Sequence, residues 1–171
     1  IGDKEYKVLL VFVPPRHGKS EECSIGFPVW YLGRNPDKEI ITVSYSAELA
    51  QDFGSKARSI VGSEAYSHIF NLTLKEDEQA KAKWRTDKGG SYTSVGVGGA
   101  VTGRGANVLL FDDPIKNREE AESEVYREKV WQFFTSTAFT RLEPGGVIVV
   151  ILTRWHIDDL AGRILANPEL S

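Results

Sequence analysis

The sequence predicts an α/β domain with a mostly parallel central sheet flanked by helices. Short apolar runs alternate along the chain with stretches of helical periodicity, the order expected of parallel strands joined by helices. The runs are uninterrupted, as in strands that are buried on both faces. The length of 171 residues fits one domain, and 41% hydrophobic with 26% charged residues is a globular composition.

The first half of the chain contains two predicted strands, each followed by a helix. Residues 8–13 form an apolar run that two prolines end, and a helix can begin near Gly18. A second strand, rich in Ile, Thr and Val, is predicted over residues 39–45, and Ser46 then caps a helix. The apolar residues of that helix recur at helical spacing and are expected to be buried: Leu49, Phe53, Ala57 and Ile60.

The middle of the chain predicts a hairpin, a buried strand and a long helix. Residues 83–97 indicate two short strands around Gly89-Gly90, and residues 107–111 indicate a buried strand that ends on Asp112-Asp113. The charged stretch 117–128 leads into a helix. The residues that this helix is expected to bury are Tyr126, Val130, Phe134 and Ala138.

The last part of the chain predicts one more strand and one more helix. A turn at Pro144-Gly145-Gly146 precedes a strand over residues 147–152. A final helix is expected after Asp158-Asp159, whose charges compensate the helix dipole. We therefore expect these two carboxylates to be structural and not a nuclease centre.

Composition excludes several classes of protein. The single cysteine, Cys23, excludes a disulfide framework and a cysteine-based zinc site, and indicates an intracellular setting. No apolar run approaches the roughly 18 residues that a membrane span requires, and no secretory leader is visible. The chain contains no Met and starts at Ile1, so we expect it to be a trimmed piece of a longer protein.

The net charge of −3 by itself argues against a nucleic-acid-binding protein. The charge is unevenly distributed, however. Residues 112–128 include seven acidic and three basic side chains, a net charge of −4, so the remainder of the chain carries +1. The acidity is thus concentrated in one window, and the average does not exclude a DNA partner.

A phosphate-binding loop is predicted where the first strand meets its helix. The loop contains Gly18-Lys19-Ser20. Glycine lets the backbone approach phosphates, the lysine reaches the outer phosphates, and the serine hydroxyl can bind Mg²⁺. Val13 stands where the usual motif has its first glycine. The alternative interpretation is an ordinary helix start with a solvated lysine.

A pair of carboxylates is predicted to complete this site. Asp112 ends a buried strand, which is the position from which an ATPase holds Mg²⁺. Asp113, the next residue, can orient and deprotonate an attacking water. The alternative is a turn before Pro114. The two motifs support each other because each provides a part of the site that the other lacks.

Four segments, residues 13–20, 95–105, 110–117 and 152–156, together resemble the ATPase domain of tailed-phage terminase large subunits. They occur in order over nearly the whole chain, and a loop with Arg but without the first glycine is typical of that family. The resemblance implies a P-loop NTPase fold of the ASCE, RecA-like class. It also implies Mg²⁺-dependent hydrolysis of ATP that drives double-stranded viral DNA into a procapsid.

The resemblance also implies roles for particular residues. Ser20 and Asp112 would bind Mg²⁺, and Asp113 stands where many of these motors carry a catalytic glutamate. Thr153 would belong to the coupling motif that senses the γ-phosphate. Arg16 would contact the phosphates in cis, and Arg104 would be an arginine finger offered to the neighbouring subunit. The loop residues that would bind the nucleotide are Pro15, Arg16, His17, Gly18, Lys19 and Ser20.

The family resemblance further predicts the setting of the domain. Residues 1–171 would form a single ATPase domain, truncated at its N-terminus and lacking the family's C-terminal nuclease domain, so we expect no DNA cleavage. The expected partners are double-stranded DNA, the portal protein, the small terminase subunit and copies of the chain in a ring. No membrane is expected, and the location would be the host cell cytoplasm at the procapsid portal.

Two other functions are compatible with the same motifs. One is a helicase-like ATPase stimulated by nucleic acid, and the other is a nucleotide-binding assembly module without turnover. The three histidines have no metal-ligand spacing. Trp84, Trp131 and Trp155 are expected to pack in the fold and not to stack on bases.

Overall fold

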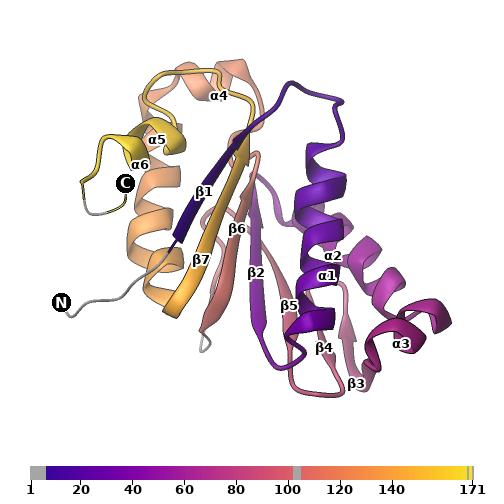
Figure 1. Cartoon of the computed structure of the whole chain (residues 1–171). Helices are drawn as coiled ribbons and strands as arrows, with labels where there is room; N and C mark the ends of the chain where they lie inside the picture. Colours follow the sequence, from indigo (N-terminus) through magenta and orange to yellow (C-terminus); the bar gives the residue numbers. More distant parts are fainter. Residues whose placement is uncertain (1–6, 102–104, 169, 171) are drawn as a thin grey trace.

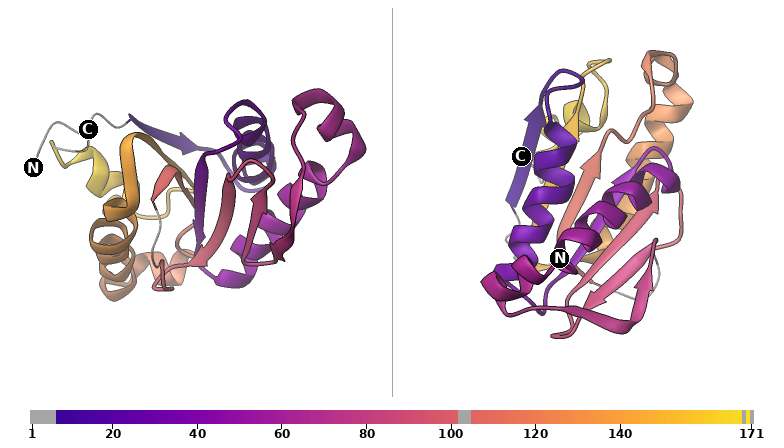
Figure 2. Two further views of the ribbon diagram at one scale, coloured as in Figure 1. Left: turned by 90° about the horizontal axis from the view of Figure 1, so that it is seen from below. Right: turned by 90° about the vertical axis from the view of Figure 1, so that its right-hand side faces the viewer.

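A computed structural model describes residues 7–101, 105–168 and 170. Within these residues the chain forms a seven-stranded sheet in the order β1-β7-β6-β2-β5-β4-β3, with helices on both faces (Figures 1 and 2). The strands are β1 (Lys7–Phe12), β2 (Glu39–Ser44), β3 (Leu74–Ala80), β4 (Lys83–Thr86), β5 (Ser91–Gly96), β6 (Ala106–Asp112) and β7 (Leu142–Leu152).

The sheet is parallel on one side and antiparallel on the other. Strands β1, β7, β6, β2 and β5 run parallel, which confirms the predicted α/β class. Strands β4 and β3 add an antiparallel edge next to β5. The expected hairpin around Gly89-Gly90 is β4-β5, and Gly89 has a φ of 96° in its turn. Strand β3 was not predicted, because its polar sequence lacks the alternation of a half-buried strand.

The helical elements connect successive strands. A helix begins at Lys19 and runs without interruption to Arg34, first as a π-helical segment and then as α1. Ser46 caps α2 as predicted, since its hydroxyl accepts a hydrogen bond from the amide of Leu49. The segments are η1 (Glu21–Gly26), α1 (Phe27–Arg34), α2 (Ala47–Val61), α3 (Glu64–Phe70), α4 (Arg118–Glu122), α5 (Glu124–Gln132), η2 (Phe133–Ala138), η3 (Phe139–Arg141) and α6 (Leu160–Leu165).

Two hydrophobic clusters lie on opposite faces of the sheet, because alternate residues of a strand point to opposite sides. On one face, α1, α2 and α3 pack on Ile40 and Tyr92. On the other, α5, η2 and α6 pack on Leu109 and Phe111. Phe134 is completely buried against Phe111, with 5.5 Å between the ring centroids.

The predictions for two helical side chains and one turn need correction. Ile60 is 41% exposed and Tyr126 is 44% exposed, although both were expected to be buried. Val61, which follows Ile60, is buried instead at the end of α2, and Tyr126 lies in the first turn of α5. The predicted turn at Pro144-Gly145-Gly146 lies inside β7, where the register against β6 shifts between Ala106 and Val108.

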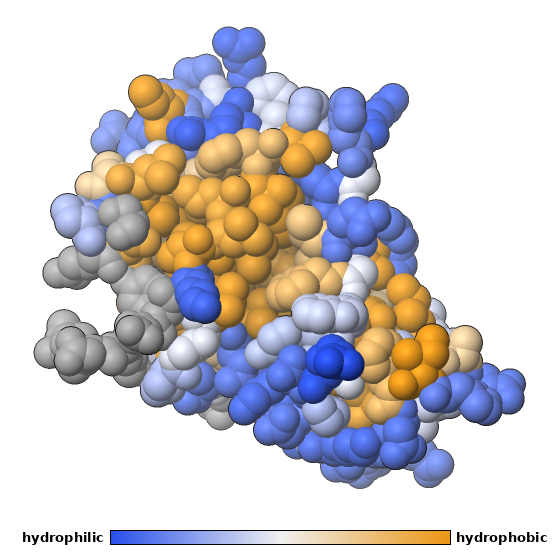
Figure 3. Space-filling view, viewed as in Figure 1, coloured by the Kyte–Doolittle hydropathy of each residue, from blue (hydrophilic) through white to orange (hydrophobic). Residues whose placement is uncertain are grey.

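Strand β1 was expected to be buried on both faces, but it forms one edge of the sheet and carries exposed apolar side chains. Leu9 and Phe12 are 54% and 45% exposed, and Figure 3 shows a hydrophobic area over this part of the molecule. Among the described residues, no helix is both long enough and apolar enough to cross a membrane.

The topology brings three strand ends together. Strands β1, β7 and β6 are neighbours and run in the same direction, so their carboxyl ends lie side by side at one end of the strands (Figure 1). In open parallel sheets this end is where ligands bind. The predicted phosphate loop, Thr153 and the Asp112-Asp113 pair follow or end these three strands.

Candidate functional site

The loop between β1 and the first helix contains two residues with left-handed backbone conformation. Arg16 has a φ of 64° and Gly18 a φ of 76°. A Cβ atom at position 18 would meet no atom within 4 Å, so Gly18 is needed for its backbone conformation and not for space. The helix starts directly after it, since the amide of Glu22 donates to the Gly18 carbonyl over 3.0 Å. The loop therefore places the first amides of the helix, which have no partner within the helix, near the carboxyl end of β1.

Lys19 joins the three strand ends. Its Nζ atom donates to Asp113 Oδ1 over 2.7 Å and lies 2.6 Å from Oδ2, and it also donates to Thr153 Oγ1 over 2.9 Å. The Thr153 amide donates to Asp113 Oδ1 over 3.2 Å. The Lys19 side chain is only 8% exposed, whereas that of Asp113 is 32% exposed. The lysine is thus held by a charged partner and is not a solvated helix-start residue.

Asp113 has a strained backbone that places its carboxylate at this contact. Its φ is 43°, which is unfavourable for a non-glycine residue by about 1–3 kcal/mol. Backbone hydrogen bonds fix the conformation: the Asp113 amide donates to Ile151 and its carbonyl accepts from Tyr45. Such strain is concentrated at functional sites, and here it turns Asp113 toward Lys19 while Asp112 stays in the strand.

Asp112 is completely buried below the loop. Its Oδ2 atom accepts a hydrogen bond of 2.6 Å from the Ser24 hydroxyl, and its Oδ1 atom has no hydrogen-bond partner among the described residues. Burial raises the pKa of the Asp112 carboxyl, while the hydroxyls of Ser24 and Ser20 lower it and the neighbouring Asp113 raises it. A second ligand for this carboxylate would relieve the cost of its burial.

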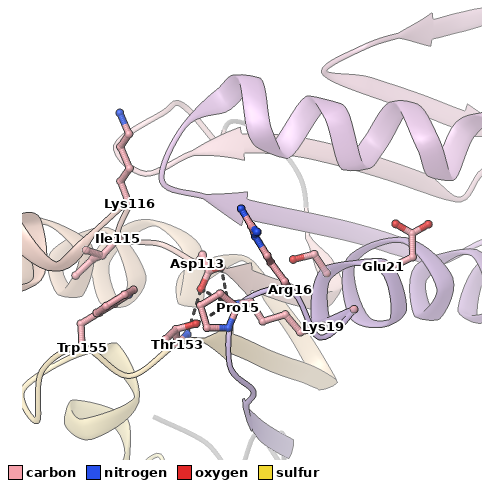
Figure 4. Close-up of a pocket in the computed structure, with 11 residues that line it drawn as sticks. Pro15, Arg16, Lys19, Glu21, Asp113, Ile115, Lys116, Thr153 and Trp155 are labelled. Atoms are coloured by element: carbon pink, nitrogen blue, oxygen red, sulfur yellow. Dashed lines mark hydrogen bonds and ion pairs between the residues drawn. The ribbon is translucent and has the colours of Figure 1, made fainter.

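A pocket of about 450 Å³ lies over the Lys19 contact. Figure 4 shows the side chains of Lys19, Asp113 and Thr153 meeting in it, while Arg16 extends away from them. The predicted residues that line the pocket are Pro15, Arg16, Gly18, Lys19, Ser20, Asp113 and Thr153. Further lining residues that sequence reasoning missed are Glu21, Ile115, Lys116 and Trp155.

Trp155 corrects a sequence expectation. It was expected to pack inside the fold, but it is 42% exposed and lines the pocket. The sequence feature that could have identified Trp155 as a pocket residue is its position two residues after Thr153, just beyond a buried strand. Trp84 does pack in the core, and its indole Nε1 donates to the Gly54 carbonyl over 2.9 Å. Trp131 packs at the edge of the core against Phe134.

The other predicted site residues lie outside the pocket or outside the described residues. The His17 ring is hydrogen-bonded to the Pro15 carbonyl and does not line the pocket. Asp112 lies beneath the pocket and not on its wall. Arg104 falls outside the described residues, so its predicted role as a trans arginine stays a prediction. In the described ranges, no group of three His, Cys, Asp or Glu residues could by itself hold a metal.

The segment after Thr153 is anchored by ion pairs. Arg154 donates to Asp159 over 2.7 Å and lies over the Phe12 ring. Asp159 caps α6 through the Gly162 amide. Asp158 accepts hydrogen bonds from Arg127 and Arg163, and these lower its pKa to about 2. Asp159 thus caps the helix start, in line with the sequence prediction, whereas Asp158 pairs with arginines of α5 and of the last turn of α6.

This arrangement combines the groups needed for phosphoryl chemistry. It places a cation, a helix N-terminus and the carboxylate of Asp113 around one pocket, with the buried carboxylate of Asp112 outside the pocket wall. The half-buried carboxylate of Asp113 can accept a proton, and the buried one of Asp112 can serve as an oxygen ligand.

Comparisons with known proteins show the family and the fold of the chain. The family model described as terminase large subunit, T4-like-virus type, N-terminal, matches residues 10–169. The crystal structure of the HK97 bacteriophage large terminase is similar, with a TM-score of 0.64 and 15% sequence identity. The match covers 94% of this chain but 32% of that protein, so the likeness shows the fold of one part. No curated protein gives a significant sequence match.

Proposed function

The chain belongs to the N-terminal family of T4-like-virus-type terminase large subunits, and we propose that it hydrolyses ATP to drive DNA packaging. The proposed reaction is Mg²⁺-dependent, and the proposed fold class is that of P-loop NTPases of the ASCE type. The observation that carries the proposal is the meeting of Lys19, Asp113 and Thr153 at the adjacent ends of β1, β6 and β7. The family itself implies a role in packaging viral DNA.

Lys19 and the loop before it are proposed to bind the triphosphate. The amides after Gly18 favour negative charge at the helix start, and Lys19 provides a fixed positive charge. Because Lys19 is paired with Asp113, the outer phosphates would compete with that carboxylate for the ammonium group. Nucleotide binding would then free Asp113 for its own role. Arg16, which is exposed at the pocket rim, is proposed to approach the phosphates in cis.

Ser20 and Asp112 are the residues that fit Mg²⁺. They offer hard oxygen ligands, and the buried Oδ1 atom of Asp112 has no other partner among the described residues. The ion would neutralise negative charge on the phosphate oxygens during transfer. This chain contributes the buried carboxylate of Asp112, whose pKa the Ser20 hydroxyl lowers.

Asp113 is proposed to be the general base. It would accept a proton from water while the water oxygen bonds to the γ-phosphorus and the bond to the bridging oxygen breaks. Asp is one methylene shorter than the glutamate common in related motors, and the left-handed φ of 43° brings the carboxylate into the pocket. Thr153 contacts both Lys19 and Asp113, so it is placed to respond when the outer phosphate enters.

The proposed partners follow from the family. They are double-stranded DNA, the portal protein, the small terminase subunit and further copies of the chain in a ring, at the procapsid portal in the host cytoplasm. Arg104 is proposed as the arginine that one copy offers to the next. Doping Arg104→Ala subunits into wild-type assemblies should lower the ATPase rate more steeply than their fraction, whereas a proportional fall would exclude a trans role.

The test of the function is release of phosphate from ATP by the chain, with and without Mg²⁺, portal and duplex DNA. We expect Mg²⁺-dependent release that portal and duplex DNA increase. Stronger stimulation by single strands than by duplex would favour the helicase-like alternative. Binding of ATP without any release, even with all partners present, would favour the assembly module.

A further inference from the structure

Ser24 is a buried residue outside the predicted motifs that touches the proposed metal site. It lies five residues after Lys19, in the π-helical segment η1, and is completely buried. Its hydroxyl donates a hydrogen bond of 2.6 Å to Asp112 Oδ2. Because this bond occupies one carboxylate oxygen, the other, Oδ1, is the only oxygen of Asp112 left without a partner among the described residues.

The local sequence explains why Ser24 faces this carboxylate. In an α-helix, the Ser24 carbonyl would accept a hydrogen bond from the amide of residue 28. Residue 28 is a proline, which has no amide hydrogen, so this bond cannot form. The helix widens into a π-helical turn at this point, a feature that often accompanies functional sites.

Tyr92 on β5 takes the place of the missing donor. Its hydroxyl donates to the Ser24 carbonyl over 3.0 Å. Tyr92 is completely buried and stacked on Trp84, with 5.4 Å between ring centroids and 10° between ring planes. The π-helical turn is therefore fixed to the sheet by a rigid aromatic side chain. Both the backbone and the side chain of Ser24 are held, one by Tyr92 and the other by Asp112.

We propose that Ser24 is a positioning residue that fixes the Asp112 carboxylate through Oδ2 and thereby reserves Oδ1 for Mg²⁺. Hydrogen-bond partners of metal-binding carboxylates orient them, and their loss commonly costs about 10–100-fold in metal affinity. Pro28 and Tyr92 support this arrangement by shaping the turn. The inference rests on the proposed function, since it assigns a role toward the same Mg²⁺ site.

The test separates metal binding from nucleotide binding. The affinity for a non-hydrolysable ATP analogue is measured by calorimetry in Mg²⁺ and in EDTA, and the ratio of the two gives the contribution of the metal. Ser24→Ala should reduce this ratio about 10-fold and leave the affinity in EDTA within about twofold. Tyr92→Phe keeps the serine hydroxyl but loses the bond to the carbonyl, so it should reduce the ratio less, by about threefold.

A matched control is Ser94→Ala. Ser94, on β5, is a buried serine like Ser24, but its hydroxyl has no hydrogen-bond partner among the described residues. This variant should bind the analogue like the wild type under both conditions. Circular dichroism and thermal melts establish that each variant is folded. If Ser24→Ala does not fold, the ratio of affinities measured for Tyr92→Phe tests the inference, and an unchanged ratio would overturn it.

The outcomes distinguish this inference from the proposed function. If the wild type binds the analogue with no contribution from Mg²⁺, the proposed function fails and the inference fails with it. If the wild type shows the contribution and Ser24→Ala retains it in full, only the inference is overturned. An equal loss of affinity in Mg²⁺ and EDTA would also overturn it, because a merely structural role would weaken both.

Discussion

Replacing Asp113 with asparagine tests the contact at the centre of the site. The amide is nearly the same size as the carboxylate and can still accept a hydrogen bond, but it carries no charge and is a poor base. In the wild type, Lys19 Nζ lies 2.7 Å and 2.6 Å from the two carboxylate oxygens, and its side chain is only 8% exposed. The substitution therefore removes the charge that competes with phosphate for Lys19.

The size of the effect follows from this geometry. The Lys19 ammonium keeps its charge in the variant, so only the ion-pair part of the contact is lost, up to about 1 kcal/mol for a partly exposed pair. A loss of about 1 kcal/mol corresponds to about fivefold tighter binding of an ATP analogue. Loss of a general base costs about 10²–10⁴-fold in rate. We therefore expect Asp113→Asn to bind the analogue more tightly than the wild type and to release phosphate at least 100-fold more slowly.

The assay combines calorimetry of the non-hydrolysable analogue with a phosphate-release assay in the presence of portal and duplex DNA. Asp52→Asn is the control, because it makes the same charge change at an exposed position on α2. It should change neither quantity. Weaker binding by Asp113→Asn would refute the competition for Lys19, and a rate within tenfold of the wild type would refute the role of Asp113 as base.

Three other variants test the site and the fold. Lys19→Ala should weaken binding of the analogue at least tenfold by calorimetry, because the charged donor for the phosphates is lost. Phe134→Ala should lower the free energy of unfolding by about 3–5 kcal/mol in urea titrations, since the ring is fully buried. Asp158→Asn tests acid stability, because Arg163 and Arg127 lower the Asp158 pKa from 3.8 to about 2. This carboxylate stabilises the fold above about pH 4 and loses that effect as the pH falls toward 2, so the variant should lose stability less steeply over this window.

Each of these has a clear contrary result. Unchanged binding by Lys19→Ala would remove the lysine from the nucleotide site. A cost below about 1 kcal/mol for Phe134→Ala would mean that the core around Phe111 collapses into the space. Asp158 is 42% exposed, so its effect should not exceed about 1 kcal/mol. A variant with the same acid dependence as the wild type would show that the pairs with Arg127 and Arg163 do not stabilise the fold.

The parallel part of the sheet could be predicted because its strands carry their own signal. Residues of β6 and of the second half of β7 are mostly buried on both faces, so these segments are nearly continuous apolar runs. The exposed edges were predicted less well. Strand β3 has a polar sequence and is specified by its pairing with β4. Ile60 and Tyr126 fit a helical pattern but lie near an end of their helices and are exposed there.

The candidate site was predictable as a set of residue types and not as a set of contacts. The glycine and lysine of the loop and the two aspartates have characteristic chemistry, so the sequence indicated them. Sequence alone could not show that Lys19 is paired with Asp113, because 94 residues separate the two and the contact depends on the strand order. Trp155 and Ser24 were missed for the same reason, since each acts through its place beside other elements.

By itself, the sequence determined the fold class and the family, because apolar runs, glycines and charged residues at fixed spacing are local properties of the chain. Only the tertiary structure decided which groups face one another. Adjacent, parallel β1, β7 and β6 bring Lys19, Thr153 and Asp113 together at one end of the strands. The missing amide of Pro28 is a local fact, but its consequence requires Tyr92 from a distant strand. Long-range packing converts such local features into a site, since hydrogen bonds and ion pairs depend on distances that only the folded chain fixes.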